Sequence, residues 1–219
     1  MLGSEAVQRV NRGLGFRRQG NTLETQIAAC FQEAQDDLEM GKTLPKFLLQ
    51  ESQSLILTAP GHTVNLPTRF ARPSDDEYIH YVKTNESTPT FLSPKAIYAD
   101  AVKAYQGSDL TMTNGFKVYV IRNQVIDFII PATTTTTFTW SYYKYAEDFA
   151  LATANEWLAH KSAKWWLIGE CGFRMAQDMR DDRAAQIFDG VRQRGRAATF
   201  ADILALEDSA GPLVMGANL

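Results

Sequence analysis

Hydrophobic residues near the start of the chain recur every three or four positions, which is the period of an amphipathic helix. In the stretch that begins at Ser4, the apolar positions are Ala6, Val7, Val10 and Leu14. In the stretch from Asn21 to Gly41 they are Leu23, Ile27, Cys30, Phe31, Ala34 and Leu38. We therefore predict two N-terminal helices. The polar positions of the second helix, expected to face solvent or a partner, are Glu33, Gln35, Asp36, Asp37 and Glu39.

After Leu44 the pattern changes to alternation, which is typical of strands with one buried face. The segments FLLQESQSLILTA (47–59) and VNL (64–66) flank the turn PGHT and predict a hairpin, and YIHYV (78–82) predicts a further strand. Ser93-Pro94 is typical of a helix start, so we expect one short helix over 93–106. The segment GFKVYVIRNQVIDFIIPA (115–132) predicts two more strands around an Arg122-Asn123 turn.

Five threonines, Thr133 to Thr137, lead into an aromatic strand that we expect from Phe138 to Tyr145. The threonine run does not alternate between polar and apolar residues, so we interpret it as a polar connection. Within the strand, Phe138, Trp140 and Tyr142 share one face because side chains alternate. We therefore expect this strand to be half buried.

The last third of the chain returns to a helical period. A helix is predicted from Ala163 to Met179, with an apolar stripe formed by Trp165, Ile168, Met175 and Met179. A second helix is predicted from Asp181 or Asp182 to Leu206, with a break at Gly190 or Gly195.

The predicted fold class is α+β: an α-helical bundle formed by the N- and C-terminal helices, with an inserted antiparallel β region that contains one short helix. The predicted parts are N-terminal helices of the bundle (1–44), the β-rich insertion (45–146), C-terminal helices of the bundle (147–207) and a C-terminal tail (208–219). The tail carries an apolar run, Leu213, Val214 and Met215, which we expect to dock on a partner.

Composition narrows the classes of function. The chain has 219 residues, of which 45% are hydrophobic and 21% charged, as in ordinary globular proteins. Its net charge of -3 gives no overall basic field, which argues against sequence-independent DNA binding by the whole surface. It contains neither 18 consecutive apolar residues nor a signal-peptide-like start, so we expect no membrane association and folding in the cytoplasm.

No catalytic, cofactor or metal-binding motif stands out, and we expect a protein that is not an enzyme. Cys171 with His62, His80 or His160 could form a thiol nucleophile and its base, but Cys171 falls in the middle of an apolar helix. The histidines lack metal-ligand spacing. Cys30 and Cys171 are expected to be buried free thiols.

Two clusters are candidates for partner contact. Arginines concentrate late in the chain, at positions 174, 180, 183, 192, 194 and 196, where they could contact phosphate or an acidic surface. The alternative is a solvated helix with local ion pairs. Trp165 and Trp166 are adjacent and point about 100° apart on a helix, so we expect one to be buried within its own subunit and the other to face a neighbour. The candidate partner-contact residues are Trp165, Trp166, Arg192, Arg194, Arg196, Leu213, Val214 and Met215.

The order of these elements resembles the head-to-tail adaptor, or head completion, proteins of tailed bacteriophages, especially the tail tubular A group. The resemblance lies in the two N-terminal helices, the Ser-Pro helix within a β insertion, the GFKVYVIRNQVIDFIIPA hairpin, the WSYYKY strand (140–145) and the closing helices that carry NEWL, WWL and DDRA. It covers nearly the whole chain. This chain differs from the simplest members in its longer tail after Leu206 and in its threonine run.

The resemblance implies a structural virion protein at the neck of the particle, assembled in the host cytoplasm. It implies a homo-oligomeric ring of about twelve copies that joins the portal protein to a tail or nozzle protein. Genomic DNA would pass through its lumen without specific binding, and no cofactor would be needed. The alternatives are a DNA-binding or other interaction module and a thiol-dependent enzyme.

Overall fold

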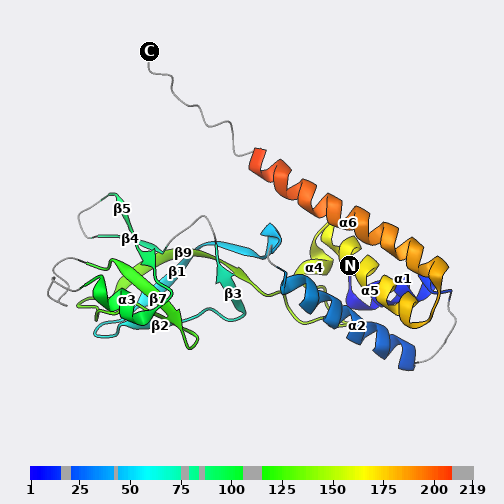
Figure 1. Ribbon diagram of the computed structural model, residues 1–219, viewed down its shortest axis with the longest axis horizontal. Coiled ribbons are helices and arrows are strands. Elements are labelled where there is room, and N and C mark those ends of the chain that lie inside the picture. The colour runs from blue at the N-terminus through cyan, green and yellow to red at the C-terminus, as the bar shows by residue number, and fades with distance from the viewer. Residues whose placement is uncertain (16–20, 42–43, 75–78, 84–86, 106–114, 209–219) are drawn as a thin grey trace, which may run out of the picture. The chain divides into compact units, whose positions relative to one another are not determined.

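The chain folds into two compact units, one formed by residues 1–48 with the chain from 146 onward and the other by residues 49–145 (Figure 1). The computed structural model describes residues 1–15, 21–41, 44–74, 79–83, 87–105 and 115–208. We refer to the unit formed by residues 1–48 and the chain from 146 onward as the helical unit, and to the unit formed by residues 49–145 as the β unit.

The helical unit is built around α5, which packs against four other helices. Its helices are α1 (Gly3–Gly13), α2 (Asn21–Glu39), α4 (Glu156–Ala159), α5 (Ala163–Asp178) and α6 (Asp182–Asp208). In Figure 1, α5 lies between α2 and α6, and it contacts both. The apolar positions predicted for α1 are buried, so both N-terminal helices are confirmed.

Glycines allow α5 and α6 to approach at backbone distance. A Cβ on Gly195 of α6 would lie 2.3 Å from the Trp166 nitrogen, and one on Gly169 of α5 would lie 2.4 Å from the Arg192 nitrogen. Gly172 of α5 faces the Phe188 ring, at 2.2 Å from a virtual Cβ. The predicted break in the last helix is therefore wrong: α6 runs through Gly190 and Gly195 because the contact with α5 requires a continuous helix there.

The β unit contains two sheets and the helix α3 (Tyr98–Lys103). The first sheet has the order β1-β9-β4-β5, with β3 also paired to β9, and the second has the order β2-β8-β7-β6. The strands are β1 (Leu49–Leu57), β2 (Thr63–Asn65), β3 (Phe70–Pro73), β4 (His80–Val82), β5 (Pro89–Phe91), β6 (Ser93–Pro94), β7 (Val118–Arg122), β8 (Val125–Asp127) and β9 (Thr136–Lys144).

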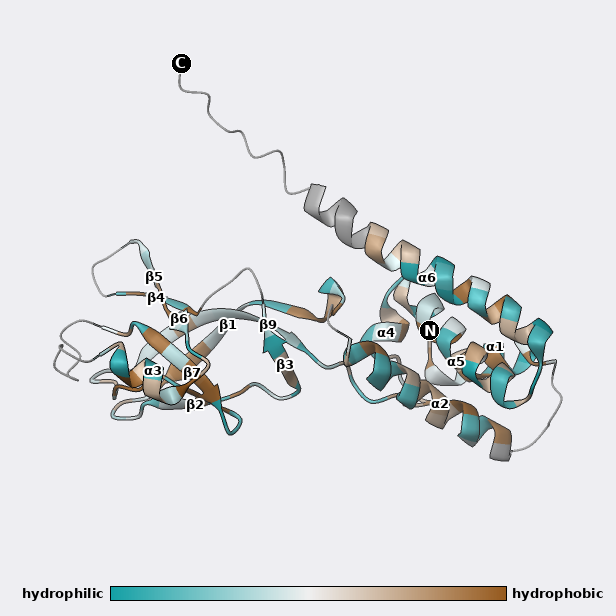
Figure 2. Cartoon of the chain, in the orientation of Figure 1, coloured by the Kyte–Doolittle hydropathy of each residue, from teal (hydrophilic) through white to brown (hydrophobic). Residues whose placement is uncertain are grey.

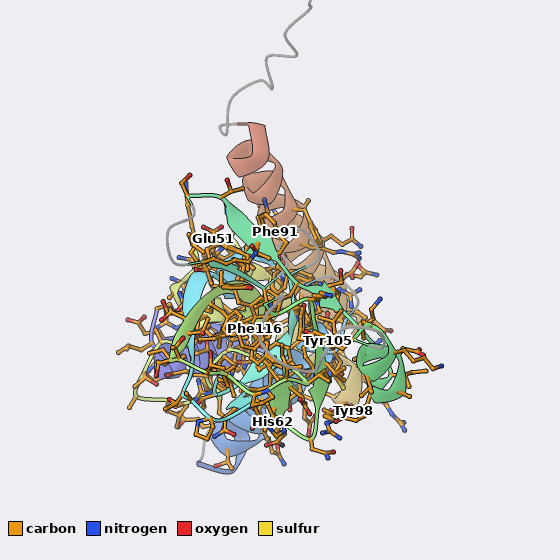
Figure 3. All side chains as sticks on the ribbon, turned by 90° about the vertical axis from the view of Figure 1, so that its left-hand side faces the viewer. Glu51, His62, Phe91, Tyr98, Tyr105 and Phe116 are labelled. Carbon is orange, nitrogen blue, oxygen red and sulfur yellow. The ribbon has the colours of Figure 1, made fainter. Side chains whose placement is uncertain are left out.

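Aromatic rings from several strands fill the core of the β unit. Phe138 of β9 stacks on Phe128 with ring centroids 4.3 Å apart, and its edge contacts involve Phe116 at 5.1 Å and Tyr81 at 5.4 Å. Phe138, Trp140 and Tyr142 are all buried, as the alternation predicts. Figure 2 shows hydrophobic segments along these strands, and Figure 3 labels Phe116 among the side chains of this unit.

The predicted fold class is wrong. The protein is a mixed α/β structure with, among the described residues, six α-helices and nine strands in two sheets. The inserted region is more sheet-rich than predicted and is not wholly antiparallel, because β6 pairs with β7 in parallel. The strands that were not predicted are β3, β5 and β6, and the physical reason is their length: two to four residues carry too few alternating positions for a reliable period.

Several local predictions fail in the same region. Ser93-Pro94 forms β6 and does not start a helix; α3 begins at Tyr98 after Ile97. The segments 47–59 and 64–66 do not form a hairpin, since β1 pairs with β9 and β2 pairs with β8. The turn between β7 and β8 falls at Asn123-Gln124, both with positive φ. The threonine run contributes its last two residues to β9.

Candidate functional site

The start of α5 is fixed by a side-chain cap. The Nδ1 atom of His160 accepts hydrogen bonds from the Ser162 and Ala163 backbone nitrogens at 3.3 and 3.2 Å, and its ring stacks on Phe47 at 4.6 Å. The cap uses backbone donors that the first helical turn leaves free. It therefore fixes the start of the helix that carries the two adjacent tryptophans, Trp165 and Trp166.

Trp165 and Trp166 face different environments. Trp166 is 9% exposed, with its ring 5.7 Å from that of Trp157 and 5.7 Å from that of Phe200. Trp165 is 36% exposed. The prediction that Trp165 belongs to the apolar stripe of α5 is therefore wrong. The stripe contains Trp166 instead, because Trp166 is the residue turned toward Trp157 and α6. The contact of Trp165 with a neighbour stays a prediction.

Two cations flank the exposed Trp165 ring. The guanidinium carbon of Arg9 on α1 lies 5.0 Å from the ring centroid, and the Lys164 ammonium lies 5.7 Å from it. Neither cation forms an ion pair with any residue that the structure describes. We call Trp165 with Arg9 and Lys164 the basic aromatic surface; no described residue neutralises its two charges.

The candidate arginines of α6 differ in availability. Arg192 is held within the chain: it pairs with Asp189 at 2.5 Å and Glu170 at 3.3 Å, and lies 4.4 Å from the Phe173 ring centroid. Arg194 and Arg196 are exposed. Arg194 Nε donates to the Gly190 carbonyl, and Arg196 lies 5.9 Å from the rings of Trp166 and Phe200. The remaining candidates, Leu213, Val214 and Met215, lie outside the described residues.

An open groove separates α2 from the C-terminal half of α5. Its volume is about 870 Å³. Its lining residues are Gln26, Ala29, Cys30, Glu33, Arg174, Met175, Gln177, Asp178, Met179 and Arg180. Arg174 is engaged by Asp37 at 2.7 Å and Glu170 at 3.1 Å, whereas Glu33 and Asp178 form no ion pair in the described part of the chain. The groove thus combines apolar side chains with two carboxylates that lack an ion pair among the described residues, and it also contains Arg180.

Both cysteines lie where α2 meets α5. Cys30 Sγ donates to the Cys171 carbonyl at 3.6 Å, and Cys171 Sγ donates to the Ile27 carbonyl at 3.7 Å. Both are free and buried. The hydrogen bond with the Cys171 thiol lowers the pKa of Cys30, and the Arg174 guanidinium acts in the same direction. Burial raises the pKa of Cys171 well above its ordinary value.

We expect the two thiols to react at different rates. With excess iodoacetamide at pH 8, Cys30 at the groove should be alkylated at least about tenfold faster than Cys171, because alkylation requires an accessible thiolate. Peptide mass spectrometry of samples quenched over time measures both rates. Equal rates in the folded protein would contradict this difference, and urea-unfolded protein provides the control in which the rates should converge.

Polar residues of α2 bind the segment that enters the C-terminal helices. Asn155 Nδ2 donates to Gln35 Oε1 at 2.6 Å, and Gln35 Nε2 donates to the Glu147 carbonyl at 3.0 Å. Glu39 accepts from Trp157 Nε1 at 2.6 Å and from the Ala146 nitrogen at 3.3 Å. The prediction that Gln35 and Glu39 face solvent or a partner is therefore wrong. Their side chains are buried because this segment supplies donors and acceptors for them.

Glu39 should make stability depend on pH. Burial raises the pKa of its carboxyl above the ordinary value of 4.5, against the opposing effect of the Trp157 and Ala146 donors. A raised folded-state pKa means that the folded protein holds the proton more tightly, so this contribution to stability is present below pH 4.5 and is lost as pH rises through the raised pKa.

The variant Glu39→Gln removes this titration while leaving an amide oxygen to accept from Trp157. Its free energy of unfolding should improve relative to wild type as pH rises from 4 to 7, by about 1.4 kcal/mol for each pKa unit of the upward shift. Urea unfolding at several pH values measures the difference. A difference that is constant with pH would show that Glu39 keeps an ordinary pKa.

In comparisons with known proteins, no protein-family profile and no curated protein matches the chain. Within the described ranges, no three His, Cys, Asp or Glu residues are placed to hold a metal ion. No described helix combines the length and hydrophobicity needed to cross a bilayer.

Sequence reasoning found Trp165 but missed the residues that surround it. Arg9 lies 156 positions earlier in the chain, and only the packing of α1 on α5 brings it to the ring. The groove was also missed, although Cys30 and Met175 were recognised as apolar positions. A usable signal was present in α2, which has an acidic polar face and no basic residue.

Proposed function

We propose that this protein is a structural subunit of a tailed-bacteriophage virion: a head-to-tail adaptor that forms a ring of about twelve copies between the portal protein and the tail. The observation that carries the proposal is the insertion architecture. Helices from both ends of the chain form one unit, and a separate β unit is inserted between residues 48 and 146. Such a chain provides one unit for ring contacts and another for the tail.

Two exposed surfaces support this division of roles. The helical unit exposes Trp165 beside Arg9 and Lys164, which form no ion pair with a described residue, and tryptophan and arginine are among the residues most enriched in interface hot spots. The β unit exposes Val82 and Phe91 on the neighbouring strands β4 and β5, at 54% and 58%. Phe91 is labelled in Figure 3. An exposed apolar pair on an edge hairpin is suited to contact with a tail or nozzle protein.

Electron microscopy of the protein mixed with the portal protein of the same phage tests the proposal. The expected result is portal rings that gain a second layer with the same rotational symmetry. A variant in the helical unit, Trp165→Ala, should reduce this layer, whereas Phe91→Ala in the β unit should leave it intact. Portal rings unchanged at a large excess of the protein would contradict the proposal.

A further inference from the structure

Charge is distributed unevenly over the helical unit. Helix α2 contains no lysine or arginine, and it exposes the carboxylates of Glu24, Glu33, Asp36 and Asp37. Four basic side chains, Arg9, Arg12, Lys161 and Lys164, lie on α1 and around the start of α5, and further arginines lie on α6 and at the end of α5. The unit therefore presents an acidic surface along α2 and a basic one beside Trp165.

These two surfaces belong to opposite sides of α5. Trp165 and Arg174 are nine residues apart, which on an α-helix corresponds to a rotation of about 180° and a rise of about 13 Å. Arg174 lines the groove beside α2, whereas the Trp165 ring lies under Arg9 of α1. Because one copy cannot bring its own Trp165 to its own groove, contact between the two surfaces requires a second copy.

The groove has the chemistry that a tryptophan between two cations requires. Met175, Met179 and the Cys30 thiol offer polarizable sulfur atoms, which pack well against aromatic rings. Glu33 and Asp178 offer carboxylates without ion pairs among the residues described. Of the two lining arginines, Arg174 is already paired with Asp37 and Glu170, so Arg180 is the one cation set against these two carboxylates. The volume of about 870 Å³ admits an indole ring.

We propose that Trp165 of one copy inserts into the groove between α2 and α5 of the next copy, with Arg9 and Lys164 facing Glu33 and Asp178. This inference rests on the proposed function, since it identifies the subunit contact of the ring. The contact joins two different surfaces, so each copy added to an open end uses one of them and leaves the other free for the next copy. Such heterologous contacts, which join two unlike surfaces, generate a closed ring when the rotation between neighbouring copies divides evenly into a full turn.

Zero-length cross-linking tests the contact. Equal amounts of isotopically light and heavy protein, at several hundred micromolar and low salt, are treated with a carbodiimide that joins lysine amines to carboxylates. The expected product joins Lys164 to Glu33 or Asp178 in peptides with one light and one heavy chain. Trp165→Ala should lose this product, and Ile187→Ala, which alters another exposed apolar residue of the unit, should retain it.

Charge reversal gives an independent readout by sedimentation. Arg9→Glu and Glu33→Lys should each weaken self-association by about tenfold, because each places like charges opposite one another. The double variant Arg9→Glu/Glu33→Lys should recover a large part of the loss, since the two exchanged side chains again carry opposite charges. Melting temperatures of all variants should stay near that of wild type, because both side chains are exposed.

A protein that stays monomeric at these concentrations, a mixed-isotope product that joins other surfaces, or a double variant weaker than both single variants would overturn the proposed contact. Failure of the adaptor role has a different signature. If the portal gains a ring layer but the Lys164 product is absent from it, the contact is wrong and the function stands. If the product forms but the portal stays bare, the contact stands and the function is wrong.

Discussion

Replacing Gly195 by alanine should lower the free energy of unfolding by about 2–3 kcal/mol, although alanine is the better helix former. The added Cβ would lie 2.3 Å from the Trp166 nitrogen and 2.7 Å from the Trp165 carbonyl carbon. These are backbone atoms of α5 and cannot rotate away, so α5 and α6 must separate. Urea unfolding followed by circular dichroism measures the loss.

Gly190 of the same helix is the matched control, because a Cβ there meets nothing within 4 Å. Gly190→Ala should raise the free energy of unfolding by up to about 1 kcal/mol through helix propensity alone. Gly169→Ala should resemble Gly195→Ala, since its Cβ would lie 2.4 Å from the Arg192 nitrogen. Equal effects at Gly190 and Gly195 would show that the two helices do not pack at backbone distance.

Replacing Phe138 by alanine should lower the free energy of unfolding of the β unit by about 3–5 kcal/mol. The side chain is 0% exposed and contacts the rings of Phe128, Phe116 and Tyr81. Its removal leaves a cavity. Strands from both sheets would have to move inward to fill it. Urea unfolding followed by near-ultraviolet circular dichroism reports on these aromatic contacts.

Phe91 provides the control for Phe138 within the same unit. It is 58% exposed, and its ring contacts His80 at 5.1 Å. Phe91→Ala should change the free energy of unfolding by less than about 1 kcal/mol, as substitutions on the surface usually do. A loss at Phe91 as large as that at Phe138 would mean that the aromatic core of the β unit is placed wrongly.

The predictions that held were those carried by long periodic segments. The stripe expected for α1 is buried, that of α2 is buried except for the half-buried Leu38, and β9 buries Phe138, Trp140 and Tyr142. These elements span 9 to 19 residues, long enough for their period to be read. The short strands β3 and β5 gave no signal, and β6 gave, at Ser93-Pro94, the signal of a helix start.

Tertiary contacts account for the other differences. Gln35 and Glu39 have polar side chains on the polar face of α2, and nothing local indicates that residues 146–157 cover them. Gly195 is read as a helix breaker unless the approach of α5 is known. The basic aromatic surface similarly joins Trp165 to Arg9, residues from opposite ends of the chain. Sequence could propose Trp165 as a contact residue but could not supply its setting.

Quantitative mass spectrometry of purified phage particles tests the central claim most directly. The protein is proposed to be a structural component of the virion neck, so particles purified free of host lysate should contain it at about twelve copies, measured against isotope-labelled peptides. The portal protein measured in the same digest provides the reference for a ring at the neck. Absence of the chain from intact particles, or a content far below that of the portal protein, would contradict the account.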